Sequence, residues 1–163
     1  MLDCIIVGAG PGGGSGAYHL SKRGRSVLVL DKAAFPRFKS CGGGVSPQIA
    51  EWFDFDFSPI VSQKVDRIRF TWQFEDPVEA LIDTPEPMWM VDRAEFDHYL
   101  IQQAVEQGAE FKPATPVTAI QFQKAEQCWT VTTPQGTFQA TYLMAADGGQ
   151  GPMSRWLGFK PLK

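Results

Sequence analysis

Glycines near the start of the chain have the spacing that binds a dinucleotide. Gly8-Ala-Gly10-Pro-Gly12-Gly13 fits the pattern G-x-G-x-x-G. The first glycine of this pattern allows a tight turn, the second lets a pyrophosphate approach the backbone, and the third lets a helix pack closely on a strand. Asp31 follows 23 residues after Gly8, at the distance where a carboxylate accepts hydrogen bonds from a ribose. We therefore predict a dinucleotide site, and a glycine-rich turn without a ligand is the less favoured interpretation.

The elements around these glycines predict a βαβ unit. The apolar run from Cys4 to Val7 is typical of a strand buried on both faces of a sheet. Small and apolar residues at helical spacing predict a helix over residues 12–23, with Gly24 as its C-terminal cap. Residues 26–30 form a second apolar run. Two such strands joined by a helix are the smallest module of a parallel sheet.

The middle of the chain predicts a loop and an inserted antiparallel layer. Prolines and three consecutive glycines indicate a loop over 32–47. Partial alternation of apolar and polar residues predicts strands at 65–72 and 78–83. Asp92, followed by Glu95, resembles a capping box and begins a helix. The predicted apolar face of that helix consists of Phe96, Tyr99, Leu100 and Ala104.

The last third of the chain predicts three strands, at 117–123, 129–133 and 137–144, with a turn at 134–136. The predicted fold class is α/β. It comprises a Rossmann-like βαβ domain with a mostly parallel sheet, together with part of an inserted antiparallel sheet. The expected domains are a dinucleotide-binding domain over 1–60 and 92–163 and an inserted substrate-side sheet over 61–91.

Composition excludes several classes of protein. The 163 residues include 15 Lys and Arg against 18 Asp and Glu, a formal charge of −3, and no basic run that would bind nucleic acid. Three widely spaced cysteines without a C-x-x-C pair argue against a disulfide framework and a cysteine zinc site, and two histidines are too few for most metal sites. We find no secretory signal and no transmembrane segment, and expect a cytoplasmic protein without a metal.

Three further segments resemble the geranylgeranyl reductase family of flavoproteins, within the group that includes p-hydroxybenzoate hydroxylase. Residues 35–46, Phe-Pro-Arg-Phe-Lys-Ser-Cys-Gly-Gly-Gly-Val-Ser, resemble its P-R-x-K-x-C-G-G-G segment. Residues 92–100 resemble its D-R-x-x-F-D-x-x-L helix. Ala145-Ala-Asp147-Gly148, with Arg155 and Leu157-Gly158 after it, is similar to its G-A-D-G…R-x-L-G motif, although Gly151, Met153 and Ser154 replace the usual residues between the two parts.

The resemblance implies FAD as the cofactor and assigns roles to individual residues. The glycine loop would hold the pyrophosphate, Asp31 the adenosine ribose, Val117 the adenine side through its backbone, and Asp147 the flavin portion or the pyrophosphate. Cys41 would face the substrate as the catalytic candidate. The full cofactor-binding set implied is Gly8, Gly10, Gly12, Gly13, Asp31, Arg37, Cys41, Gly42, Gly43, Gly44, Arg93, Val117, Asp147 and Gly148.

Several of these residues have a plainer interpretation. Cys41 could be a small buried apolar residue, because free cysteines usually are. Arg37 could belong to a solvated loop, Arg93 could pair with Glu95 or Asp97 at the helix start, and Asp147 could be a turn residue.

The implied activity is reduction of carbon–carbon double bonds of a prenyl chain by reduced FAD, with NADPH or ferredoxin as the electron donor. The implied substrate is a prenyl lipid, so peripheral contact with a membrane is an open expectation. One alternative is a flavin monooxygenase or halogenase, although the halogenase signature W-x-W-x-I-P is absent. Another is a non-catalytic remnant. Proteins of the family are more than twice as long, so we expect an N-terminal part that is not a competent enzyme alone.

Overall fold

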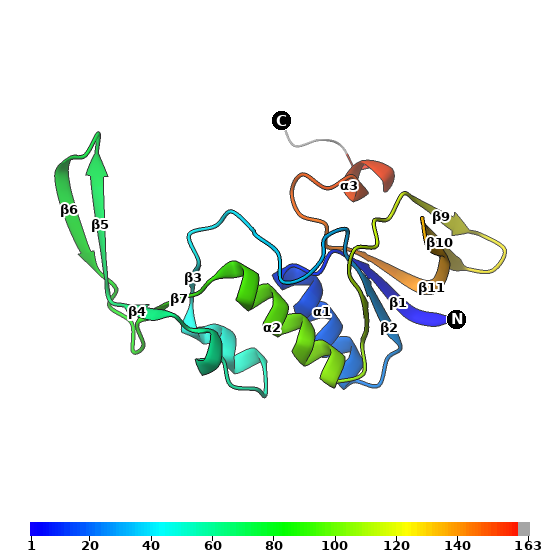
Figure 1. The fold of residues 1–163 in the computed structure, drawn as a ribbon, viewed down its shortest axis with the longest axis horizontal. Helices are drawn as coiled ribbons and strands as arrows, with labels where there is room; N and C mark the ends of the chain where they lie inside the picture. The colour runs from blue at the N-terminus through cyan, green and yellow to red at the C-terminus, as the bar shows by residue number, and fades with distance from the viewer. Residues whose placement is uncertain (160–163) are drawn as a thin grey trace. The chain divides into compact units, whose positions relative to one another are not determined.

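The computed structural model describes residues 1–159, which form two compact units (Figure 1). The first unit consists of Met1–Arg37 and the chain from Asp97 onward, and the second is Phe38–Phe96. The functional domain limits expected from the sequence, at 60/61 and 91/92, stay a prediction. Within residues 1–159, none of the helices combines the length and the apolarity needed to cross a bilayer.

A six-stranded sheet forms the centre of the first unit. Its strand order is β8-β2-β1-β11-β10-β9, in which the first three neighbouring pairs are parallel and the last two antiparallel. This arrangement confirms the predicted fold class. The strands are β1 (Leu2–Val7), β2 (Val27–Leu30), β8 (Glu110–Lys112), β9 (Ala119–Gln123), β10 (Cys128–Thr133) and β11 (Gly136–Ala145).

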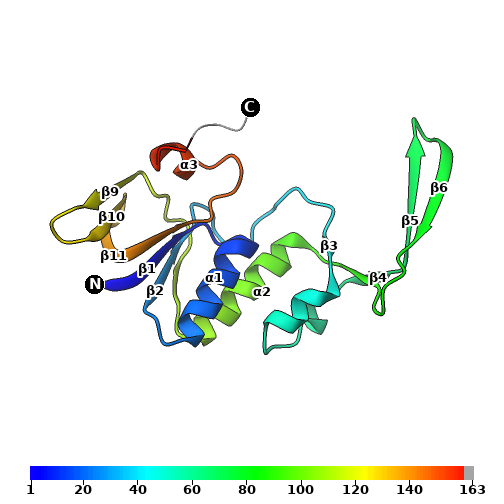
Figure 2. The same ribbon diagram turned by 180° about the vertical axis from the view of Figure 1, so that it is seen from behind.

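Two helices lie side by side along β1 and β2, α1 (Pro11–Lys22) and α2 (Arg93–Glu106), and a short helix α3 (Met153–Trp156) follows β11 (Figures 1 and 2). Gly14 of α1 lets the helices approach, because a Cβ there would lie 3.1 Å from the Cβ of Leu100. Asp92 caps α2, since its Oδ1 accepts a hydrogen bond from the Ala94 N–H at 2.7 Å. On the buried face Ile101 takes the place expected for Tyr99, which is only half-buried.

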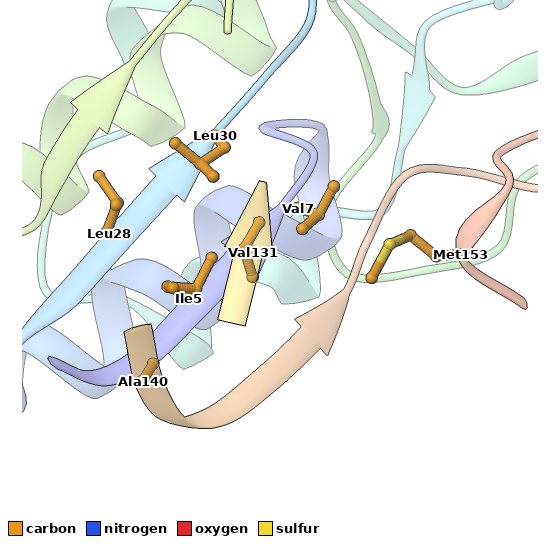
Figure 3. Packing of buried hydrophobic residues seen from close by; sticks show 7 residues of the cluster. All are labelled: Ile5, Val7, Leu28, Leu30, Val131, Ala140 and Met153. Atoms are coloured by element: carbon orange, nitrogen blue, oxygen red, sulfur yellow. The ribbon is translucent and has the colours of Figure 1, made fainter. Parts of the chain in front are cut away.

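One hydrophobic cluster of the first unit lies on the sheet face opposite α1. Ile6 points toward α1, because a Cβ on Gly13 would lie 3.4 Å from its Cγ2. Side chains alternate along a strand, so Ile5 and Val7 point to the other face. There they pack with apolar residues of β2, β10, β11 and α3, as Figure 3 shows. The cluster consists of Ile5, Val7, Leu28, Leu30, Val131, Ala140 and Met153.

The second unit contains two small antiparallel sheets and an aromatic core. Its three-stranded sheet has the order β3-β7-β4, and a separate hairpin pairs β5 with β6. Phe57, Trp89 and Phe96 are buried, and the ring of Phe57 contacts the rings of the other two. The strands are β3 (Gly44–Val45), β4 (Gln63–Val65), β5 (Arg67–Trp72), β6 (Glu75–Leu81) and β7 (Met88–Met90), and 3-10 helices span Pro47–Trp52 and Ser58–Ile60.

Candidate functional site

The first and third glycines of the loop after β1 are required by the protein's own packing. Gly8 has φ +102°, and a Cβ there would overlap the carbonyl oxygen of Ala146. A Cβ on Gly13 would overlap the carbonyl oxygen of Gly8. A larger residue at position 13 would push α1 away from the end of β1, and one at position 8 would push away the segment that follows β11. The structure therefore gives these two glycines the roles of tight turn and close helix–strand contact that the spacing predicts.

Gly10 and Gly12 are different, because open space surrounds them. Apart from its chain neighbours and its own helix, no atom of the described residues lies within 4 Å of a Cβ built on Gly12, and the nearest such atom to a Cβ on Gly10 is the Nη2 of Arg37 at 3.5 Å. Gly10 is the N-cap of α1 and supplies no side-chain hydrogen bond, and the first turn of α1 holds no acidic residue. Among residues 1–159, no side chain of the N-cap residue caps the N–H groups at this helix end. A pyrophosphate fits this arrangement in both shape and charge.

Asp31 connects this loop to the end of β2. Its side chain is 7% exposed. One carboxylate oxygen, Oδ2, accepts a hydrogen bond from the N–H of Ala9 at 2.7 Å, and Oδ1 accepts one from Ala33 at 2.9 Å. Its carbonyl oxygen accepts the N–H of Thr115 at 2.7 Å. Asp31 therefore holds the glycine loop in place, a structural task that the sequence did not indicate, and its contact with a ribose stays a prediction.

Arg37 places a fixed positive charge beside Gly10. Its Nη2 lies 3.0 Å from Oδ2 of Asp97, and its guanidinium carbon lies 4.9 Å from the centre of the Phe35 ring. The Arg37 side chain is 18% exposed and that of Asp97 is fully buried. The interpretation of Arg37 as part of a solvated loop is therefore wrong. Its Nη1 is buried and has no hydrogen-bond partner among the described residues, which suits an anion brought by a ligand.

Sequence reasoning named Asp97 only as a possible partner of Arg93 and gave it no place in the site. It lies next to Phe96 on the buried side of α2, where an unpaired carboxylate would be costly. Its position among apolar residues of a helix was the sequence feature that could have predicted a positively charged partner for Asp97. The structure pairs Asp97 with Arg37, 60 positions earlier in the chain.

Asp147 and Val117 both have structural tasks in the first unit. Oδ2 of Asp147 accepts a hydrogen bond from the N–H of Met153 at 2.9 Å, which ties the loop after β11 to α3. Gly148 follows with φ +81°, a conformation that favours glycine. The side chain of Val117 is partly buried and packs against the core cluster. A cofactor contact for either residue stays a prediction.

The remaining predicted site residues, Cys41, Gly42, Gly43, Gly44 and Arg93, belong to the second unit. The Cys41 thiol is exposed, so its interpretation as a small buried residue is wrong. Gly43 has φ +77°, and a Cβ there would overlap the carbonyl oxygen of Val91. The Gly43 carbonyl accepts the N–H of Val91 at 2.9 Å. This backbone hydrogen bond fixes residues 41–44 beside the start of α2. The Cys41 thiol stays exposed.

Comparison with known proteins decides the family. A model of the FAD binding domain matches residues 1–163. The chain belongs to this FAD binding domain family. FAD is accordingly the dinucleotide that the open loop, the helix N-terminus and Arg37 are suited to hold.

Individual relatives of this FAD binding domain are longer than the chain. An uncharacterised protein of Methanosarcina barkeri is 36% identical over 94% of this chain and 39% of its own length. Menaquinone reductase of Mycobacterium tuberculosis is 31% identical over 96% of this chain and 40% of its own length. A geranylgeranyl bacteriochlorophyll reductase-like structure from Thermoplasma acidophilum has a TM-score of 0.83 at 23% identity and covers 98% of this chain and 42% of its own, which shows the shared fold.

The matches extend over several flavoenzyme activities. Geranylgeranyl diphosphate reductase of Rhodobacter capsulatus is 32% identical over 66% of this chain. Digeranylgeranylglycerophospholipid reductase 1 of Methanothermobacter thermautotrophicus is 26% identical, and aklavinone 12-hydroxylase of Streptomyces peucetius is 28% identical, both over 96% of this chain. The chain thus spans about 40% of the length of most curated relatives it matches.

Proposed function

We propose that this FAD binding domain serves a reductase that saturates carbon–carbon double bonds of a prenyl chain. The observation that carries the cofactor part is Arg37, a cation fixed by Asp97 beside the open glycine loop. The Cys-Gly-Gly-Gly segment at 41–44 and the reductases among the relatives support the prenyl reductase part.

The chain's own residues would do three things toward this activity. The N-terminus of α1 and Arg37 would neutralise the pyrophosphate. Gly42 and Gly44 would let backbone approach a planar ring, because they carry no side chain. Cys41 would face the double bond with its exposed thiol. FAD, when bound and reduced, would supply the hydride for one carbon of the double bond while the other carbon takes up a proton, and we propose NADPH or ferredoxin as the source of electrons.

Retention of flavin by the purified chain tests the cofactor site. The chain is incubated with FAD, desalted, and its visible absorption spectrum recorded. We expect a retained flavin band from the wild type and its loss from Arg37→Ala. Arg25→Ala is the matched control. Arg25 precedes β2, so it lies at the N-terminal ends of the parallel strands, whereas the glycine loop lies at their C-terminal ends. Equal flavin retention by the wild type and Arg37→Ala would refute the proposed phosphate contact.

The second candidate is an oxygen-using flavoenzyme, which the hydroxylase among the relatives favours. The two candidates differ in what happens after reduction. A monooxygenase or halogenase consumes oxygen when NADPH is added to the FAD-loaded protein, whereas the proposed reductase does so only slowly. A chain that stays colourless after incubation with FAD would instead support the non-catalytic alternative.

A further inference from the structure

Arg37 lies in a segment that has no regular structure of its own. Within the described chain, residues 31–43 contain no helix or strand. Arg37 is the last residue of the first unit before the chain passes into the second, and Phe38, which follows it, is 89% exposed. The position of the Arg37 side chain therefore depends on the groups that its guanidinium contacts.

Two groups of the first unit hold this guanidinium. Its Nη2 lies 3.0 Å from the carboxylate of Asp97, and its central carbon lies over the ring of Phe35, 4.9 Å from the ring centre. Phe35 belongs to the same irregular segment as Arg37, whereas Asp97 lies in α2 and its side chain is completely buried. Solvent screens such an enclosed ion pair only weakly. Asp97 is therefore the anchor that fixes the orientation of the guanidinium.

The ion pair leaves Arg37 with hydrogen-bond donors but with little net charge. The carboxylate of Asp97 balances the charge of the guanidinium. Nη1 is enclosed and has no acceptor among residues 1–159, and Nη2 lies 3.5 Å from the position that a Cβ on Gly10 would take. Arg37 is thus suited to bind a phosphate oxygen by a directed hydrogen bond at short range, and less by its charge at long range.

We infer that Asp97 is a positioning residue for the phosphates of FAD, on which it acts only through Arg37. This inference rests on the proposed function and adds to it how Arg37 binds: Asp97 orders the guanidinium before the ligand arrives. The rotamer freedom of an arginine side chain corresponds to about thirtyfold in a binding constant. Arg37 has lost much of this freedom in the folded chain, so ligand binding need not remove it.

Asp97 also has an effect of the opposite sign, because a carboxylate beside the arginine repels a phosphate. If charge decided the affinity, removing this carboxylate would strengthen phosphate binding. We expect the positioning effect to be larger. Without Asp97, the guanidinium of Arg37 is free to turn toward water, to which residues 38–42 beside it are already exposed. The direction of the change on substitution therefore distinguishes the two effects.

ADP and adenosine are a matched pair of probes, because they differ only in the diphosphate. Their affinities for the whole chain are measured by calorimetry and expressed per folded molecule, with the folded fraction taken from urea unfolding. Asp97→Ala removes the acceptor for Nη2, and we expect the ADP affinity to fall by about tenfold while the adenosine affinity stays unchanged. Asp97→Asn keeps one side-chain carbonyl oxygen as an acceptor and should restore part of the ADP affinity.

Arg37→Lys tests the same inference without altering the buried carboxylate. A lysine has a single nitrogen in place of the guanidinium fork, so it cannot pair with Asp97 and bind a phosphate oxygen in the same way. We expect this variant to bind ADP about as weakly as Arg37→Ala does. The control is an exposed ion pair near the N-terminal ends of the parallel strands, formed by Arg25 and Asp3 at 3.7 Å. Arg25→Lys and Asp3→Asn should leave the ADP affinity per folded molecule unchanged.

Three results would overturn the inference. Tighter ADP binding by both Asp97 variants would show that repulsion is the larger effect. Unchanged ADP affinity in Asp97→Ala, or wild-type affinity in Arg37→Lys, would show that Arg37 needs no positioning. Flavin retention separates this inference from the proposed cofactor site. A flavin band that is lost in Arg37→Ala but kept in Asp97→Ala refutes the positioning role alone, whereas a wild type that binds neither FAD nor ADP refutes both.

Discussion

Replacing Asp31 by alanine should destabilise the chain even without FAD. The carboxylate is the acceptor for the N–H of Ala9, a fully buried residue, so in Asp31→Ala that N–H loses its partner out of reach of water. An unpaired buried donor costs about 1–3 kcal/mol, and loss of the bond from half-buried Ala33 adds up to about 1 kcal/mol. We therefore expect the free energy of unfolding to fall by about 1–4 kcal/mol.

Urea unfolding of the FAD-free chain, followed by tryptophan fluorescence, measures this loss as a decrease of about 0.5–2 M in the urea concentration at the midpoint. Asp31→Asn keeps one side-chain carbonyl oxygen as an acceptor, so its free energy of unfolding should lie between those of the wild type and Asp31→Ala. Asp83→Ala deletes an exposed carboxylate and is the control, expected within about 0.5 kcal/mol of the wild type. A similarly small change for Asp31→Ala would refute the reasoning. If stability falls but FAD affinity per folded molecule does not, Asp31 supports the loop and does not bind the ribose.

Three further perturbations test other parts of the structure. Gly13→Ala should destabilise the chain by about 2–4 kcal/mol because its Cβ meets backbone, whereas Gly12→Ala, in open space on α1, should stabilise it by about 0.5–1 kcal/mol; urea unfolding checks both. Cys41 should react rapidly with a thiol reagent and the two buried cysteines only after unfolding, and bound FAD should slow that reaction if the thiol lies near the flavin. Hydrogen bonds from the side chain and backbone of Ser26 hold the pKa of Asp3 below its ordinary value of 3.8. This stabilisation is present above about pH 4 and is lost as the pH falls through the lowered pKa. The stability difference between the wild type and Asp3→Asn should therefore be present at pH 7 and shrink below pH 4, as measured by unfolding at each pH.

Apolar runs and helical spacing made the main elements predictable. The apolar runs that became β1 and β2, the helical spacing of α1 and α2, and the turn at 134–136 depend on interactions between near neighbours, so the sequence shows them directly. The strands β3, β4, β7 and β8 were not predicted, because two or three residues are too few to display a period. These strands form only where a partner strand is already in place.

For this protein, sequence by itself determined the dinucleotide loop and the fold class, because glycine spacing and apolar runs are local properties. Only tertiary structure decided that Asp97 secures Arg37 beside Gly10 and that Asp31 holds the loop through Ala9. Each of these contacts joins residues more than 20 positions apart. Their pairing follows from burial, since a carboxylate enclosed by the fold must find a donor or a cation wherever the chain brings one, and nothing in the local sequence specifies which it will be.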